Sequence, residues 1–290
     1  MRKKVCVITG ANSGIGKAAA IQIAQQGHHV VMACRNPERG QAALQDVQRK
    51  SGNDSVELII LDMSLQSSIK AFAETFLAKY DLLDVLIHNA AAFDIRQKER
   101  KLTSEGIELV WATNHIGPVL LTELLLNAIK QSEQGRIITI SSKGLMMYPF
   151  LKVNIGDPES AHRKFSVQNA YYQSKLAQVM YTYWLAEELR GTAVTVNSIR
   201  VTNVKIDVDT RYPEVSKLAR KMYSFKSRFS ISPEKMAETY TYLALSPEVS
   251  LTTGTYYDDP QHIVQSTSYC RDQEKIKQVM DLSMSYIKNT

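Results

Sequence analysis

Six short apolar runs, separated by longer stretches with helical character, limit the architectures that this chain can adopt. The runs are VCVIT at 5–9, HVVMAC at 29–34, VELIIL at 56–61, DVLIH at 84–88, RIITIS at 136–141 and AVTVNSI at 193–199. Continuous apolar runs of this length are typical of strands buried on both faces. Because strands that alternate with helices form right-handed βαβ units, the pattern predicts an α/β fold, with a doubly wound parallel sheet covered by helices on both faces.

Helix signals occur between the runs and again near the C-terminus. Asn36 and Pro37 form a cap and first-turn pair, and Ser232 with Pro233 begins a later helix in the same way. The alternation stops after residue 200, and the segment at about 202–232 is predicted to be an excursion from the fold. A last helix is expected at about residues 271–288.

Length and composition permit one large domain. The 290 residues are 44% hydrophobic, which is enough for the core of a single α/β domain over 1–290. No run reaches the roughly 18 uninterrupted apolar residues of a membrane span. The apolar run after Met1 stops at Gly10, which is too short for a signal peptide.

The cysteines and the net charge indicate where the protein is located and which kinds of partner it binds. Cys6, Cys34 and Cys270 have no CxxC spacing, so neither a zinc site nor a disulfide framework is expected, and a reducing, cytoplasmic location fits best. The net charge is +6 and the isoelectric point is about 9.0. Because the basic residues are spread along the chain, we expect no nucleic acid partner, and a phosphate-rich cofactor explains the charge more simply.

A glycine cluster follows the first predicted strand. Gly10, Gly14 and Gly16 lie in TGANSGIG and lead into the helical stretch KAAAIQIAQQ. Glycines allow the backbone to approach a pyrophosphate closely, and the N–H groups at the start of a helix can bind it. The spacing G-x-x-x-G-x-G differs from the G-x-G-x-x-G fingerprint, so a purely structural turn is the alternative.

The end of the second predicted strand, MACRNPERG, indicates which dinucleotide such a turn would hold. Enzymes that prefer NAD usually place an acidic residue there to bind the ribose 2′-hydroxyl. Arg35 occupies this region, no acidic residue occurs before Glu38, and a guanidinium can bind a 2′-phosphate in bidentate fashion. The sequence therefore favours NADP(H), with a solvated arginine at a strand end as the alternative.

A tyrosine and a lysine lie four residues apart in YYQSK. Tyr171 and Lys175 share one face of a predicted helix. A tyrosine hydroxyl has an ordinary pKa of about 10, and a nearby ammonium lowers that pKa by stabilising the phenolate. Tyr171 is thus a candidate proton donor or acceptor, whereas a solvated stripe is the common alternative for such a pair.

Five elements in this order, TGANSGIG, HNAA, TNHIG, ISS and AYYQSK, resemble the short-chain dehydrogenase/reductase family. In addition, TNHIGPVLLTELLL, YYQSKLAQVMYTYWLAEEL and TTGTYYDD are similar to its retinol dehydrogenase-like branch, which includes many NADP(H)-dependent carbonyl reductases. The resemblance covers nearly the whole chain. It implies a single-domain Rossmann fold with about seven strands. We interpret the excursion at about 202–232 as a substrate lid.

Carried over by position, the resemblance implies a set of catalytic residues. Ser142 would orient the substrate carbonyl, Tyr171 would donate the proton, and Lys175 would assist Tyr171 and hold the nicotinamide ribose. Asn114 would complete a proton relay through an ordered water. The implied cofactor-binding residues are Gly10, Asn12, Ser13, Gly14, Ile15, Gly16, Arg35, Asp62, Met63, Asn89, Ala90, Tyr171, Lys175 and Val204.

Some positions leave alternatives or depart from the family pattern. Tyr172 and Ser141 are rivals for the roles of their neighbours, and the family register argues against both. His88 stands where many members carry asparagine, and we interpret it as a structural residue satisfied by the backbone. Val201 and Thr202 replace a Pro-Gly pair that shapes the backbone around the nicotinamide, so the local loop must differ from the usual one.

An apolar helical stripe occurs within the predicted lid. Leu218, Met222, Phe225 and Phe229 recur at helical spacing, with basic residues around them. A mobile lid over an apolar pocket explains the stripe best, and a membrane-surface helix is the alternative.

Taken together, the sequence predicts an NADP(H)-dependent oxidoreductase that interconverts a carbonyl and an alcohol on an apolar small molecule. An alcohol dehydrogenase for retinoid-like or steroid-like substrates is the nearest alternative, and a non-catalytic NADP(H)-binding regulator is the alternative of another class. The protein is expected to bind no metal and to be a monomer or homodimer.

Overall fold

An eight-stranded sheet forms the centre of the molecule, with the strand order β3-β2-β1-β4-β5-β6-β7-β8. The computed structural model describes residues 2–205 and 230–288. Strands β1 to β7 pair in parallel, and β8 pairs antiparallel with β7. The strands are β1 (Val5–Thr9), β2 (His29–Cys34), β3 (Val56–Ile60), β4 (Val85–His88), β5 (Arg136–Ser142), β6 (Thr195–Val201), β7 (Thr255–Asp258) and β8 (His262–Val264). This arrangement confirms the predicted doubly wound α/β fold.

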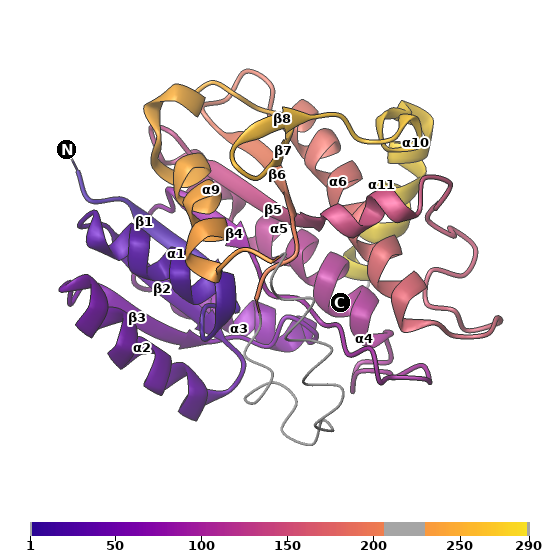
Figure 1. Cartoon of the computed structure of the whole chain (residues 1–290), viewed down its shortest axis with the longest axis horizontal. Helices are drawn as coiled ribbons and strands as arrows, with labels where there is room; N and C mark the ends of the chain where they lie inside the picture. The colour runs from indigo at the N-terminus through magenta and orange to yellow at the C-terminus, as the bar shows by residue number, and fades with distance from the viewer. Residues whose placement is uncertain (1, 206–229, 289–290) are drawn as a thin grey trace.

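Helices cover both faces of the sheet (Figure 1). They are α1 (Gly14–Gln25), α2 (Pro37–Ser51), α3 (Gln66–Leu77), α4 (Leu109–Trp111), α5 (Gly117–Lys130), α6 (Val167–Glu188), α9 (Pro233–Leu245), α10 (Ser268–Arg271) and α11 (Gln273–Lys288). A π-helical turn, η1 (Ala112–Ile116), joins α4 to α5, and the 3-10 turns are η2 (Lys143–Met147) and η3 (Pro247–Val249).

Two apolar clusters lie on opposite sides of the sheet because successive strand residues point to opposite faces. In β1, Cys6 and Ile8 belong to the cluster that α1, α2 and α9 cover, whereas Val7 belongs to the cluster that α3, α5, α6 and α11 cover. The strand order reverses beside β1, where β2 lies on one side and β4 on the other. In open α/β sheets, ligands bind outside the carboxyl ends of the strands at such a reversal.

The predicted helix starts are confirmed by their hydrogen bonds. The Asn36 side chain accepts from the Arg39 N–H at 2.8 Å, and Pro37 is the first residue of α2. The Ser232 side chain accepts from the Lys235 N–H at 3.2 Å at the start of α9.

The continuous helical stretch Leu109–Lys130 is long and apolar enough to cross a membrane by length and composition alone. However, 72% of its most apolar window is buried inside the fold, as is common for a core helix of a globular protein. It packs beside α3 and α6.

Several boundaries differ from the sequence-based expectation. Strand β6 begins at Thr195 and continues to Val201, two residues beyond the predicted end. The predicted number of about seven strands is close to the eight observed, but β7 and β8 were not located in the sequence, since they are only four and three residues long and carry no extended apolar run. Most of the predicted lid at about 202–232 lies outside the described residues, including the stripe of Leu218, Met222, Phe225 and Phe229.

Candidate active site

The glycine turn leaves β1 at its carboxyl end. Gly10 has φ +66°, and its N–H donates to the Ala33 carbonyl at 2.7 Å. A β-carbon at Gly10 would lie 2.9 Å from the Cα of Ala90, closer than real β-carbons approach a backbone atom. Gly14 has φ +55°, but no described atom lies within 4 Å of where its β-carbon would be. Glycine is therefore favoured at position 10 by both the positive φ and the lack of room for a β-carbon. At position 14 only the positive φ favours glycine, because the space around it is open.

Asn89 fixes the glycine turn from the end of β4. Its amide Nδ2 donates to the carbonyls of Thr9 at 2.9 Å and Gly10 at 3.2 Å. A β-carbon on Gly16 would collide with this amide. The predicted cofactor residues Gly10, Gly16, Asn89 and Ala90 thus lie together, and the side chain of Asn89 is used to hold the turn.

The start of α1 has the character of an anion site. Ser13 is its N-cap but makes no cap hydrogen bond through its side chain in the described structure, and the first turn contains no acidic residue. The N–H groups of a first helical turn have no partners within the helix, and the helix dipole favours negative charge there. Asn12 and Ser13 directly precede this helix, and Gly14 and Ile15 are its first two residues. Helix starts of this kind bind phosphate groups.

Arg35 lies beside this turn at the end of β2. Its side chain is 70% exposed, and its Nε is 3.9 Å from a carboxylate oxygen of Asp62. Asp62 is itself held by the N–H and hydroxyl of Ser64, at 2.9 and 2.7 Å. Because an exposed pair at this distance is weak, the guanidinium can turn toward a phosphate. Met63 is buried in the core and packs against Gly117.

Tyr171 and Lys175 lie on α6 as predicted. The Lys175 ammonium is 5.7 Å from the centroid of the Tyr171 ring, and it donates to the Ile140 carbonyl at 2.7 Å. The Lys175 side chain is buried, and this burial lowers its pKa to about 8. The ring of Tyr171 is half-buried and packs against Phe93, with 4.5 Å between centroids. The pair is therefore set into the protein and is not part of a solvated stripe.

Ser142 is the last residue of β5 and caps the turn η2. Its hydroxyl oxygen accepts from the Gly144 N–H at 3.2 Å. Gly144 in turn packs on Tyr172, since a β-carbon there would collide with the Tyr172 hydroxyl. The turn that follows Ser142 thus rests on α6 next to Tyr171.

The two rival residues have structural contacts. The Ser141 hydroxyl is buried, donates to the Lys175 carbonyl at 3.2 Å and accepts from the Tyr256 hydroxyl at 3.2 Å. Tyr172 packs against Tyr148, with 4.6 Å between ring centroids. The choice of Ser142 and Tyr171 as the candidate reactive residues stays a prediction.

Asn114 lies in the π-helical turn η1, where the Gly117 N–H bonds to the Ala112 carbonyl. Its Oδ1 accepts from the Ala92 N–H at 2.6 Å, and its Nδ2 donates to the Ala92 carbonyl and the Ser174 hydroxyl, both at 3.1 Å. The Ser174 hydroxyl donates to the Tyr171 carbonyl at 2.7 Å. Asn114 thus joins the loop after β4 to the helix that carries Tyr171. Single π turns inside α-helices are frequent at functional sites.

The departure from Pro-Gly has a structural counterpart. Val201 continues β6 and is paired in register with Ser142 in β5. A proline could not donate a backbone hydrogen bond in such a strand. Val204 forms an isolated bridge with Ile231, where the Lys205 N–H bonds the Ile231 carbonyl at 2.9 Å. Val204 and Lys205 are therefore held beside Ile231.

His88 has a side-chain partner instead of the backbone partner that we expected. Its Nε2 lies 2.8 Å from the Thr122 hydroxyl, and the residue is 2% exposed. Burial lowers the pKa of His88 to about 3, so the imidazole is neutral in the folded protein. Thr122 reaches His88 because α5 packs against β4, and this packing is not visible in the sequence.

Two cavities lie near α6. One, of 760 Å³, lies at the amino ends of β6 and β7, beside Leu189, Thr195 and Gly254, and none of the predicted site residues line it. The other, of 90 Å³, is lined by Ser142 and by residues such as Leu176 and Cys270. Among the described residues, no cluster of three or more metal-binding side chains occurs.

Phe93 and Ser174 contact the candidate site residues Tyr171 and Asn114, but the sequence patterns did not predict them. Phe93 lies in an irregular loop whose position a periodic pattern does not predict. Ser174 lies within YYQSK, so the helical spacing could have predicted that it faces inward. Its partner Asn114 is distant in the chain and could not be predicted in this way.

The sequence is similar to those of known dehydrogenases. A family model described as "short chain dehydrogenase" matches residues 4–215. Mouse retinol dehydrogenase 14 is 33% identical over 296 residues, covering 98% of this chain and 83% of that protein. Mouse retinol dehydrogenase 11 is 35% identical over 258 residues, covering 89% and 78%. Bovine dehydrogenase/reductase SDR family member 13 is 34% identical over 289 residues, covering 98% and 73%.

Solved structures show the same fold. A protein from Mycobacterium paratuberculosis has a TM-score of 0.76 at 26% identity, covering 98% of this chain and 93% of that one. A short chain dehydrogenase from Shigella flexneri, complexed with NADP, has a TM-score of 0.66 at 21% identity, covering 89% and 97%.

The contact between Gly16 and Asn89 predicts the effect of one methyl group. Gly16→Ala gains up to about 1 kcal/mol of helix propensity, but overpacking against the Asn89 amide costs about 1–3 kcal/mol, so a net loss of stability is expected. Dinucleotide affinity should fall with it. Thermal unfolding and a fluorescence titration with NADPH would measure both. Gly156→Ala is the control, since the nearest atom to its added carbon is 3.9 Å away. Equal behaviour of the two variants would contradict the packing argument.

The neutral state of His88 predicts a pH dependence of stability. In the unfolded chain His88 becomes protonated below its ordinary pKa of about 6.5, whereas in the folded protein it stays neutral down to about pH 3. The free energy of unfolding therefore falls as the pH decreases from about 6.5 to about 3. Urea unfolding at pH 7 and pH 5 should show a loss that is about 2 kcal/mol smaller for His88→Asn than for the wild type. Parallel losses in the two proteins would mean that His88 is protonated in the folded state.

Proposed function

Because the chain belongs to the short-chain dehydrogenase/reductase family, we propose that it is an NADP(H)-dependent oxidoreductase that interconverts an aldehyde or ketone with an alcohol on an apolar small molecule. The observation that carries the proposal is the pairing of Tyr171 with the buried ammonium of Lys175. A cation in a low-dielectric surrounding favours a phenolate more strongly than it would in water. Tyr171 is thereby suited to give a proton to a carbonyl oxygen or to take one from an alcohol.

The residues around the glycine turn fit a dinucleotide phosphate. The start of α1 would hold the pyrophosphate, and the exposed guanidinium of Arg35 would bind a 2′-phosphate. Lys175 would also reach the ribose. When bound, the nicotinamide supplies or accepts the hydride, and the side chains of this protein manage the charge on the substrate oxygen.

Ser142 and Tyr171 would both hydrogen-bond that oxygen. The Ser142 hydroxyl oxygen already accepts from the Gly144 N–H, which leaves its own hydrogen to be donated to the substrate. Two donors aimed at one oxygen stabilise the negative charge that develops there. Asn114 keeps its proposed place in the proton relay. Its side-chain amide is bonded to Ala92 and Ser174, so this amide also fixes the position of the turn.

An apolar substrate is supported by the surroundings of Tyr171. Phe93, Val110, Val167 and Ala170 form a small apolar cluster that packs with its ring. Beyond Ser142, the side chains of Met146, Met147 and Phe150 are 60%, 80% and 90% exposed. Such side chains can cover an apolar molecule at the entrance of the site.

A retinoid-like or steroid-like alcohol is the second candidate substrate class. The similar proteins include retinol dehydrogenases 11, 13 and 14, which supports this reading without fixing the direction of the reaction. We further propose a cytoplasmic protein, a monomer or homodimer, without a nucleic acid partner. The reduced state of its three buried cysteines is consistent with that location.

Removal of the Tyr171 hydroxyl tests the catalytic proposal. Tyr171→Phe should lower kcat by about 10²–10⁴-fold with little change in NADPH affinity, because only the proton transfer is lost. The assay follows NADPH and NADH absorbance with a panel of aldehydes, ketones, quinones and retinal. Tyr172→Phe is the matched control and should retain activity. NADPH binding without turnover of any panel member by the wild type would favour the non-catalytic regulator.

Arg35 tests the cofactor preference. Arg35→Ala should weaken NADPH binding by roughly 10- to 100-fold and leave NADH binding nearly unchanged, because the lost charge-assisted hydrogen bonds reach only the 2′-phosphate. Titrations with both cofactors would measure the ratio. Arg49→Ala, which removes an exposed arginine that pairs with Asp46 on α2, is the control. An unchanged ratio in Arg35→Ala would refute the assigned role.

A further inference from the structure

The C-terminal helix α11 packs against α6 and against the π-helical turn that carries Asn114. The turn and α11 are distant in sequence, and two polar contacts join them. One contact involves His115, the residue after Asn114, and the other passes through Glu159, in the segment between Ser142 and Tyr171. Neither contact includes a residue that would touch cofactor or substrate in the proposed reaction.

The first contact fixes the turn itself. The fully buried His115 accepts from the Gln178 amide at Nδ1, at 3.0 Å, and its Nε2 donates to the Ser283 hydroxyl at 2.7 Å. The Ser283 hydroxyl in turn donates to the Val279 carbonyl at 2.7 Å. Burial lowers the pKa of His115 to about 3, so this chain of donors and acceptors persists at neutral pH. The turn is thereby tied to α6 on one side and α11 on the other.

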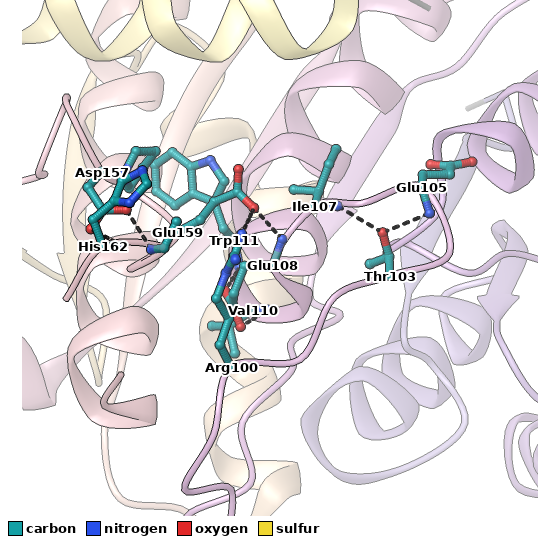
Figure 2. A network of polar contacts seen from close by, with 12 residues as sticks. Arg100, Thr103, Glu105, Ile107, Glu108, Val110, Trp111, Asp157, Glu159 and His162 are labelled. Atoms are coloured by element: carbon teal, nitrogen blue, oxygen red, sulfur yellow. Dashed lines mark hydrogen bonds and ion pairs between the residues drawn. The ribbon is translucent and has the colours of Figure 1, made fainter. Parts of the chain in front are cut away.

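The second contact fixes the start of the same helical stretch. One carboxylate oxygen of Glu159 accepts from the Glu108 N–H at 2.7 Å and from the Arg100 guanidinium at 3.2 Å. The other oxygen accepts from the Tyr286 hydroxyl at 2.7 Å. Figure 2 shows the network around Glu108 and Glu159.

Glu108 carries this restraint into the helix. Its carboxylate accepts from the N–H groups of Val110 at 3.0 Å and Trp111 at 2.8 Å, so it caps α4, which leads directly into η1. The stretch that contains Asn114 is therefore held at its start through Tyr286 and at its centre through Ser283. These two residues lie three positions apart on α11 and so share one face of that helix.

We propose that α11 is a positioning element for the reaction, and that Ser283 and Tyr286 are positioning residues that hold the Asn114 turn in register with Tyr171. The inference rests on the proposed function, in which this turn takes part in catalysis. A π turn is rarer than an α turn, and its surroundings must keep it in place. A displacement of about 1 Å in a catalytic group can lower a rate by about 100-fold, so the outer contacts affect chemistry.

The test removes single hydroxyl groups from α11. Tyr286→Phe and Ser283→Ala, alone and combined, are compared with the wild type by hydrogen–deuterium exchange of residues 112–117 and by kcat and KM with NADPH and the best carbonyl substrate. Each variant should raise the exchange of the turn by about tenfold and lower kcat by about 10- to 100-fold, with KM for NADPH within about twofold.

Tyr80→Phe is the matched control. It also removes a tyrosine hydroxyl that donates to a glutamate, here Glu57 in the edge strand β3. It should change neither the exchange of residues 112–117 nor kcat. Unchanged exchange in both α11 variants would overturn the proposal, as would faster exchange with unchanged kcat. A wild type without any turnover would contradict the proposed function instead, while the exchange data would still decide whether α11 holds the turn.

Discussion

The close approach of the β1–α1 turn to the end of β4 is the constraint on which the candidate site depends. The Asn89 amide bonds two carbonyls of the turn, and neither Gly10 nor Gly16 has room for a β-carbon. This contact joins the two strands between which the order of the sheet reverses. It also orients the first turn of α1, whose N–H groups would hold an anion. Glycine is needed here chiefly so that protein can pack against protein, with the approach of a ligand as a second consequence.

The side-chain amide of Asn114 holds the backbone around Tyr171 in place, as the amide of Asn89 does for the glycine turn. Asn114 bonds the backbone of Ala92 and the hydroxyl of Ser174, which bonds the carbonyl of Tyr171. The loop after β4, the π turn and α6 therefore keep one fixed arrangement. Because every polar atom of the Asn114 amide has a partner in the protein, the arrangement exists before any ligand binds.

Lys175 shows how burial and reactivity are linked. Removal of the ammonium from water lowers its pKa to about 8, and the bond to the Ile140 carbonyl replaces only part of its hydration. A buried cation is stabilised by a nearby negative charge, and a phenolate at Tyr171 would supply one. Desolvation thus makes the electrostatic influence of Lys175 on Tyr171 stronger than the same pair would have on a solvated surface.

Local sequence patterns were enough to predict most of the elements and the chemically important residue types. Apolar runs predicted β1 to β6 to within a few residues, and the spacing of Tyr171 and Lys175 predicted their shared face, because both patterns are local. It did not predict the short β7 and β8, the partner of His88, or the contacts of α11. His115 and Ser283 are 168 residues apart, and Glu159 and Tyr286 are 127 apart. Such pairs depend on how whole helices pack in three dimensions, and no local periodicity in the sequence records that packing.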